Sequence, residues 1–129
     1  MTTAQPSAIA TAVRRLGDAA DLIEESGWVR HELAVDKDGV AVWPDDPCAT
    51  RFCASGAVHA AFADLRPSKF GESTAEEIAN TALDIQCYRD YGLFYIDWND
   101  YEALDRRQVV RFMRRTARNL EARRIEVLL

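Results

Sequence analysis

Residues 6–28 read PSAIATAVRRLGDAADLIEESGW, and this stretch decides the fold. Apolar side chains recur along it every three or four positions, which is the spacing of one face of an α-helix. They are Ile9, Val13, Leu16, Ala20 and Ile23. Pro6 suits the first turn of a helix and Gly27 suits its end, so we predict a helix of about five turns between them. Its apolar stripe must be covered by other elements, and the rest of the chain is expected to pack around it.

The sequence after this helix has the pattern of a β-hairpin. Apolar and polar residues alternate over 29–35, and apolar residues return over 40–43. Between them, Asp36-Lys37-Asp38-Gly39 is a typical turn sequence. We therefore predict that 29–35 pairs with 40–43. Because an isolated two-stranded hairpin is marginal in water, it is expected to lie against the helices.

A second helix is predicted over about 49–64, with Asp46 or Thr50 as its cap. One face of this helix carries little side-chain bulk, so another helix is expected to approach it closely. The small residues on that face are Cys53, Gly56, Ala57, Ala60 and Ala61. A third helix is predicted near 74–91, where Ser73 and Glu76 form a capping box and Gly92 ends the helix.

The C-terminal part begins with a short apolar run at 93–98, which is either a strand or a buried crossing segment. The last helix is predicted over about 106–122, capped by Asp105, with Leu104 packed on Val109 as a hydrophobic staple. An apolar tail follows and is expected to dock on the body of the protein. Its residues are Ile125, Val127, Leu128 and Leu129.

Together these patterns predict a single α+β domain over 1–129, mostly helical, with about four helices, one β-hairpin and a frayed segment at 1–5. The chain has 129 residues, 48% of them hydrophobic and 29% charged, which suits one domain and leaves no room for a second core. Trp28, Trp43 and Trp98 are expected at its centre. No long apolar run or secretory signal is present, and three cysteines form no C-x-x-C pair, so we expect a cytoplasmic protein that spans no membrane.

Charge is distributed unevenly along the chain. Residues 106–129 carry 8 basic and 2 acidic side chains, a balance of +6, whereas residues 1–105 carry 8 basic and 19 acidic ones, a balance of −11. On a helical projection the last helix has an apolar face and an arginine face. The arginine face consists of Arg107, Arg111, Arg114, Arg115 and Arg118.

Three interpretations of the arginine face remain open. It binds an acidic protein partner, it follows a nucleic-acid backbone, or it neutralises acids of the same chain. The candidate internal partners lie on the first helix and are Asp18, Asp21, Glu24 and Glu25. Because the whole chain has a net charge of −5, long-range repulsion makes nucleic acid the weaker choice.

Cys53 is the candidate nucleophile. A thiol in the first turn of a helix has its pKa lowered by the amide dipoles there. His59 falls on a different face of the same helix, so the base would be His31 from the hairpin, oriented by Asn99 or Asp100. The alternative is a buried cysteine that packs beside Gly56, with Asn99 and Asp100 serving a turn and a cap.

The sequence indicates no metal and no cofactor. Zinc would have to use Cys48, Cys53, His59 and Cys87, whose spacing matches no common ligand pattern. The glycine-rich phosphate loops, the zinc-protease motif and the serine-hydrolase motif are also absent.

Several fragments occur in an order that resembles a family of small uncharacterised bacterial and phage proteins. The fragments are Gly27-Trp28, the turn from Asp36 to Gly39, Asp46-Pro47, the run Phe52-Cys53-Ala54-Ser55-Gly56-Ala57, and Trp98-Asn99-Asp100 before a final helix. The resemblance covers about residues 9–120 and implies an architecture without an established activity. We therefore expect a small, non-enzymatic accessory protein that binds a macromolecular partner, with a protein as the favoured partner. A small cysteine-dependent hydrolase or transferase using Cys53 is the alternative, and nucleic-acid binding is a further one.

Overall fold

The computed structural model describes residues 3–68 and 71–128, and these residues form a mostly helical α+β domain. The elements follow the order α1 (Pro6–Ser26), β1 (Ala34–Val35), β2 (Ala41–Val42), β3 (Arg51–Phe52), α2 (Ala54–Phe62), a 3₁₀ turn η1 (Ala63–Leu65), α3 (Thr74–Tyr91), α4 (Tyr95–Tyr101) and α5 (Arg106–Glu121). The predicted fold class is confirmed. The number of elements is corrected, because this part of the chain holds five α-helices rather than about four and three strands rather than two.

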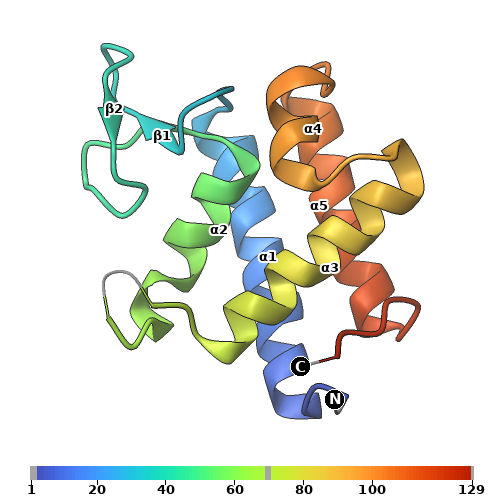
Figure 1. Cartoon of the computed structure of the whole chain (residues 1–129). Helices are drawn as coiled ribbons and strands as arrows, with labels where there is room; N and C mark the ends of the chain where they lie inside the picture. The colour runs from blue at the N-terminus through green and yellow to red at the C-terminus, as the bar shows by residue number, and fades with distance from the viewer. Residues whose placement is uncertain (1–2, 69–70, 129) are drawn as a thin grey trace.

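Helix α1 forms the centre of the molecule and packs on α5, α2 and α3 (Figure 1). Its buried face confirms the predicted stripe, with the alanines Ala12 and Ala19 joining it and Val13 at its margin. Both ends of the chain lie at the same end of α1, where Ala4 N donates to Val127 O at 3.2 Å. The C-terminal tail docks there as predicted through Ile125 and Val127, which are buried. Leu128 is half-exposed, and Leu129 lies outside the described residues.

The sheet is smaller than the predicted hairpin and has one more strand. Strand β1 lies between β2 and β3 and pairs antiparallel with both, placing Ala34 opposite Val42 on one side and Phe52 on the other. The predicted strand 29–35 shortens to Ala34–Val35. The reason is local: His31 has φ 71°, a left-handed conformation that interrupts an extended run, and its N–H donates to Asp100 on α4 instead.

Helix α2 begins later than predicted, at Ala54 instead of near residue 49. Residues 51–52 are taken by the pairing of β3 with β1, and Cys53 N donates to Leu33 O at 3.1 Å. The cap is neither Asp46 nor Thr50. It is Cys53, whose Sγ accepts a hydrogen bond from Gly56 N at 3.2 Å.

Helices α3 and α5 have the predicted bounds to within one residue, but two details of their caps differ. Ser73 accepts from Glu76 N as expected, whereas the Glu76 carboxylate pairs with Arg66 instead of completing the capping box. Asp105 caps α5 by accepting from Gln108 N at 2.8 Å. The predicted staple is wrong, because Leu104 is 77% exposed.

The apolar run at 93–98 is not a strand, and of the two predictions the buried segment is nearer to what the structure has, because Tyr95 and Trp98 are buried. It leads into the short helix α4, which turns Tyr95, Trp98 and Asn99 inward at helical spacing. Trp98 is fully buried and stacks on Tyr91 of α3, with 4.7 Å between the ring centroids. Only this tryptophan is central as predicted, since Trp28 is half-buried and Trp43 is 47% exposed.

Helix α2 packs on α1, and on its small-residue face Gly56 makes a close approach to the backbone beside β1. A Cβ atom on Gly56 would lie 1.8 Å from Leu33 O. Gly17 in α1, by contrast, has no neighbouring atom within 4 Å of such a Cβ, so it marks no close helix approach.

These two glycines give a matched test of the packing. Gly56→Ala should lower the free energy of unfolding by about 1–3 kcal/mol or more, because backbone atoms must move to admit one methyl group. Gly17→Ala should leave stability unchanged or raise it by up to about 1 kcal/mol, because alanine is the better helix former. Urea denaturation of both variants measures the difference. Equal stabilities would show that α2 does not need the close approach.

Candidate functional site

Asn99 joins three separate segments through its side chain. Its Oδ1 accepts from Trp28 Nε1 at 2.8 Å and from Ala54 N at 3.0 Å, and its Nδ2 donates to Asp100 Oδ1 at 3.0 Å. A longer hydrogen bond of 3.4 Å runs from Nδ2 to Val29 O. Ala54 N is one of the N-terminal amides of α2 that the helix itself cannot satisfy. The buried carboxamide therefore fixes α4 against the start of α2 and the segment after α1.

The four candidate catalytic residues lie around one small cavity, here named the Cys53 pocket. Cys53, His31, Asn99 and Asp100 line its volume of about 120 Å³ together with parts of neighbouring elements. His31 is exposed, and its Nδ1 lies 4.0 Å from Asp100 Oδ2. The four residues that the sequence suggested as a catalytic group therefore do lie together in the fold.

The chemistry of this pocket favours a protonated thiol. Cys53 is 6% exposed, and burial raises the pKa of its thiol to about 11, an effect larger than the lowering by the Gly56 amide. Burial likewise raises the pKa of Cys87 to about 12. At neutral pH neither side chain is a good nucleophile, because the thiolate is the reactive form.

Thiol labelling checks this assignment. In the native protein at neutral pH, Cys48 should react rapidly with a thiol reagent because it is exposed, whereas Cys53 and Cys87 should react only on unfolding. The Cys48→Ser variant should then show no rapid reaction. Rapid labelling of Cys53 in that variant would contradict the assignment and favour the cysteine-dependent enzyme.

The role of Asn99 leads to a stability prediction. Asn99→Ala leaves Trp28 Nε1 and Ala54 N without their acceptor, and it should lower the free energy of unfolding by about 1–3 kcal/mol for each buried donor. Asp97→Ala on the exposed face of the same helix is the control and should change it by no more than about 0.5 kcal/mol. Similar values for the two variants in urea denaturation would contradict the role given to Asn99.

The arginine face of α5 divides into paired and unpaired members. Arg114 donates to Asp21 at 2.8 Å and to Glu24 at 2.5 Å, so part of the face is neutralised by α1. The hydrogen bond from Arg114 lowers the pKa of Glu24. Arg115 lies 3.5 Å from Asp90 on α3.

Within the described residues, three exposed arginines of this face have no carboxylate partner. They are Arg107, Arg111 and Arg118. The last two line an open groove of about 520 Å³ between α5 and the C-terminal end of α3. We call it the arginine groove, and its other lining residues are Asp90, Tyr91, Gln108, Phe112, Arg114 and Arg115. Arg107 lies outside it.

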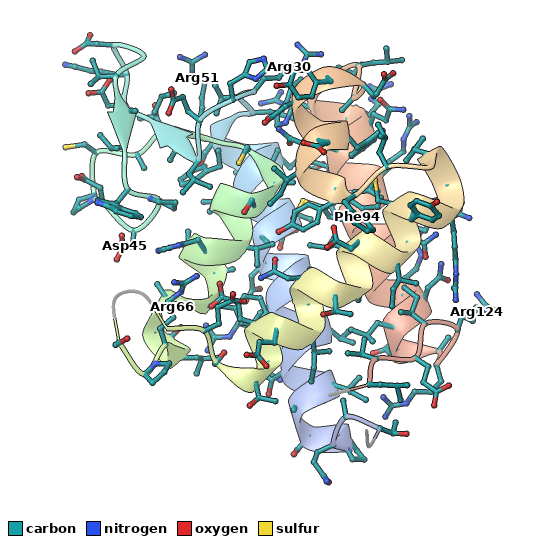
Figure 2. All side chains as sticks on the ribbon, in the orientation of Figure 1. Arg30, Asp45, Arg51, Arg66, Phe94 and Arg124 are labelled. Carbon is teal, nitrogen blue, oxygen red and sulfur yellow. The ribbon has the colours of Figure 1, made fainter. Side chains whose placement is uncertain are left out.

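Exposed aromatic side chains lie beside this groove. Tyr91 is part of it and is 43% exposed. Tyr88 and Phe94 are each 61% exposed, and their ring centroids are 5.8 Å apart. Figure 2 shows Phe94 at the surface, on the segment between α3 and α4. Of these three aromatics Tyr91 lines the arginine groove, and Tyr88 lies one turn before it on α3.

A second polar pocket, of about 330 Å³, was missed from the sequence. It lies between α2 and α3, adjoins the Cys53 pocket, and is named here the α2–α3 pocket. Its lining residues are Leu33, Ser55, His59, Arg66, Glu72, Glu76, Asn80, Asp84, Tyr95 and Ile96. The sequence does contain a pattern that indicates this pocket. Four polar residues recur at every fourth position and so fall along one side of a helix: Glu72, Glu76, Asn80 and Asp84.

The possible zinc ligands do not assemble. Cys48 is exposed before β3, Cys53 and Cys87 are buried on different helices, and His59 packs near Trp43 with 6.0 Å between ring centroids. Over 3–68 and 71–128, no three His, Cys, Asp or Glu side chains are placed to hold a metal ion. In the same residues, no helix has the length and apolarity needed to cross a membrane.

Comparison with known proteins places the chain in a family without assigning it an activity. Neither a curated protein nor a solved structure matches the chain. A family model, described as a family of unknown function (DUF6197), matches residues 8–119. The matched segment runs from the first turn of α1 to the last turn of α5, and so includes the Cys53 pocket, the arginine groove and the α2–α3 pocket. On this match the chain belongs to the DUF6197 family.

Proposed function

We propose that this protein is a non-enzymatic binding protein whose arginine groove receives an acidic segment of a protein partner. The observation that carries the proposal is the state of Arg111 and Arg118. Both are exposed in a groove, and neither has a carboxylate partner within the described residues, although residues 1–105 hold 19 acidic side chains.

The contrast with Arg114 strengthens this argument. Arg114 shows that α5 can be neutralised by the same chain where Asp21 and Glu24 face it. Ion pairs within the chain therefore involve Arg114 and Arg115, and leave Arg111 and Arg118 of the same groove without a carboxylate partner in the described residues. Such a surface attracts an anionic partner and orients it as it docks.

The aromatic neighbours favour a protein over other polyanions. Tyrosine and arginine are enriched among the residues that contribute most of the free energy of protein association. Tyr91 lies in the groove with Arg111 and Arg118, and the exposed Tyr88 lies one turn before it on α3. The net charge of −5 also repels nucleic acid at long range.

The cysteine-dependent enzyme has less support, because the Cys53 thiol is buried and its pKa is raised. A cytoplasmic setting is part of the proposal, since reduced thiols persist there and all three cysteines are free. A bacterial or phage source would suit the 14 arginines and 20 alanines, a bias typical of GC-rich coding sequences.

Fluorescence anisotropy with a labelled peptide of alternating Glu and Tyr tests the proposal. The wild-type protein should bind this peptide more tightly than a labelled thymidine oligonucleotide. Arg111→Glu combined with Arg118→Glu should weaken peptide binding by about tenfold or more, because two groove cations become anions.

The control variant carries the same change of net charge elsewhere. Arg14→Glu combined with Lys37→Glu alters exposed positions on α1 and in the hairpin turn, and should change the affinity by less than about threefold. Equal losses in the two double variants would show that only net charge matters. Tight, salt-sensitive oligonucleotide binding that the groove variant abolishes would establish nucleic acid as the partner instead.

A further inference from the structure

The α2–α3 pocket has more carboxyl groups than cationic side chains. Glu72, Glu76 and Asp84 contribute three carboxyl groups, and Arg66 is the one guanidinium that lines the pocket with them. Arg66 lies beside the C-terminal end of α2 (Figure 2) and pairs with Glu76 Oε2. His59 adds no positive charge at neutral pH, because burial and the nearby Arg66 lower its pKa.

Most polar groups of this pocket are already ordered by one another. Tyr95 OH donates to Asn80 Oδ1 at 2.5 Å, and Asn80 Nδ2 donates to Glu72 Oε2 at 3.0 Å. Tyr95 N donates to Asp84 Oδ1 at 3.0 Å. Ser55 on α2 lines the pocket beside Tyr95. The network fixes the carboxylates in place and uses one oxygen of each.

The second oxygen of each carboxylate is left without a donor in the described part of the chain. Glu76 is the decisive case, because the residue is 1% exposed and its Oε1 is buried with no hydrogen-bond partner. Glu72 is exposed and Asp84 is half-buried, so Glu72 Oε1 and Asp84 Oδ2, which accept no hydrogen bond from the described residues, are open to water. A buried acceptor without a donor costs free energy, and nearly all such groups in folded proteins are satisfied.

We propose that the α2–α3 pocket binds a small organic cation bearing N–H donors, a primary amine or a guanidinium. Its positive charge would balance the surplus of carboxylates, and its N–H groups would supply the donor that the buried Glu76 Oε1 lacks and replace water at Asp84 Oδ2 and Glu72 Oε1. The volume of about 330 Å³ lies at the lower end of the range for small-molecule sites, which suits a ligand of a few carbon atoms. Leu33 and Ile96 would pack on its aliphatic part.

Isothermal titration calorimetry of the full chain tests this assignment with agmatine, butylamine and butyrate as probes. Agmatine and butylamine should bind saturably at one site, and butyrate should not bind. Glu76→Gln should weaken agmatine binding about 10- to 100-fold, because a hydrogen bond to a charged group is lost. Glu77→Gln removes the same charge from the adjacent, exposed position on α3 and should leave the affinity unchanged.

Asp84→Asn provides a second variant in case Glu76→Gln does not fold. Its amide oxygen can still accept from Tyr95 N, so the start of α4 keeps its anchor while the pocket loses a negative charge. It should also weaken agmatine binding about 10- to 100-fold. The assignment is overturned if neither amine binds saturably, if butyrate binds equally well, or if Glu77→Gln weakens binding as much as the pocket variants. The outcome is independent of the arginine groove, which shares no lining residue with this pocket.

Discussion

The hydrogen bonds of the Asn99 carboxamide hold together segments that lie far apart in the sequence. One buried oxygen accepts from the indole of Trp28 and from the first amide of α2, and the amide group orients Asp100, which accepts from the backbone of His31. Ala54 N is buried and the Trp28 indole N–H is partly buried, so both depend on the Asn99 oxygen as their acceptor, whereas the hydrogen bond of His31 N to Asp100 is exposed. The position of α4 relative to α2 and to the end of α1 therefore depends on one side chain.

Both candidate binding surfaces depend in turn on where α4 lies. Its first residue, Tyr95, reaches Asp84 and Asn80 and so orders the polar wall of the α2–α3 pocket. Its buried Trp98 stacks on Tyr91 and also contacts Phe112, which sets the end of α3 beside α5 and shapes the arginine groove. A helix of seven residues thus connects two sites that share no lining residue.

What the sequence could predict follows from the length of each element. Helices α1, α3 and α5 extend over four to six turns, so their periodicity and caps are visible, and their bounds were predicted to within a residue. Strands of two residues and a seven-residue helix contain at most about two periods, too few for a pattern to be recognised, and their conformations are set by tertiary contacts such as Cys53 N to Leu33 O and His31 N to Asp100. The same distinction applies to the sites: the arginine face was visible as periodicity, whereas the burial of Glu76 depends on how α2 lies against α3.

The charge distribution gives the two surfaces opposite preferences. The C-terminal segment is cationic, and α1 pairs with Arg114 of the arginine groove, so Arg111 and Arg118 of that groove remain available to anions. The α2–α3 pocket has the reverse imbalance, because three carboxyl groups share one guanidinium. An anion that the arginine groove attracts is repelled by the carboxylates of the α2–α3 pocket, and a cation is repelled by the groove, so a ligand of one charge sign does not suit both sites. A macromolecular anion in the groove and a small cation in the pocket can therefore occupy the same molecule without competing.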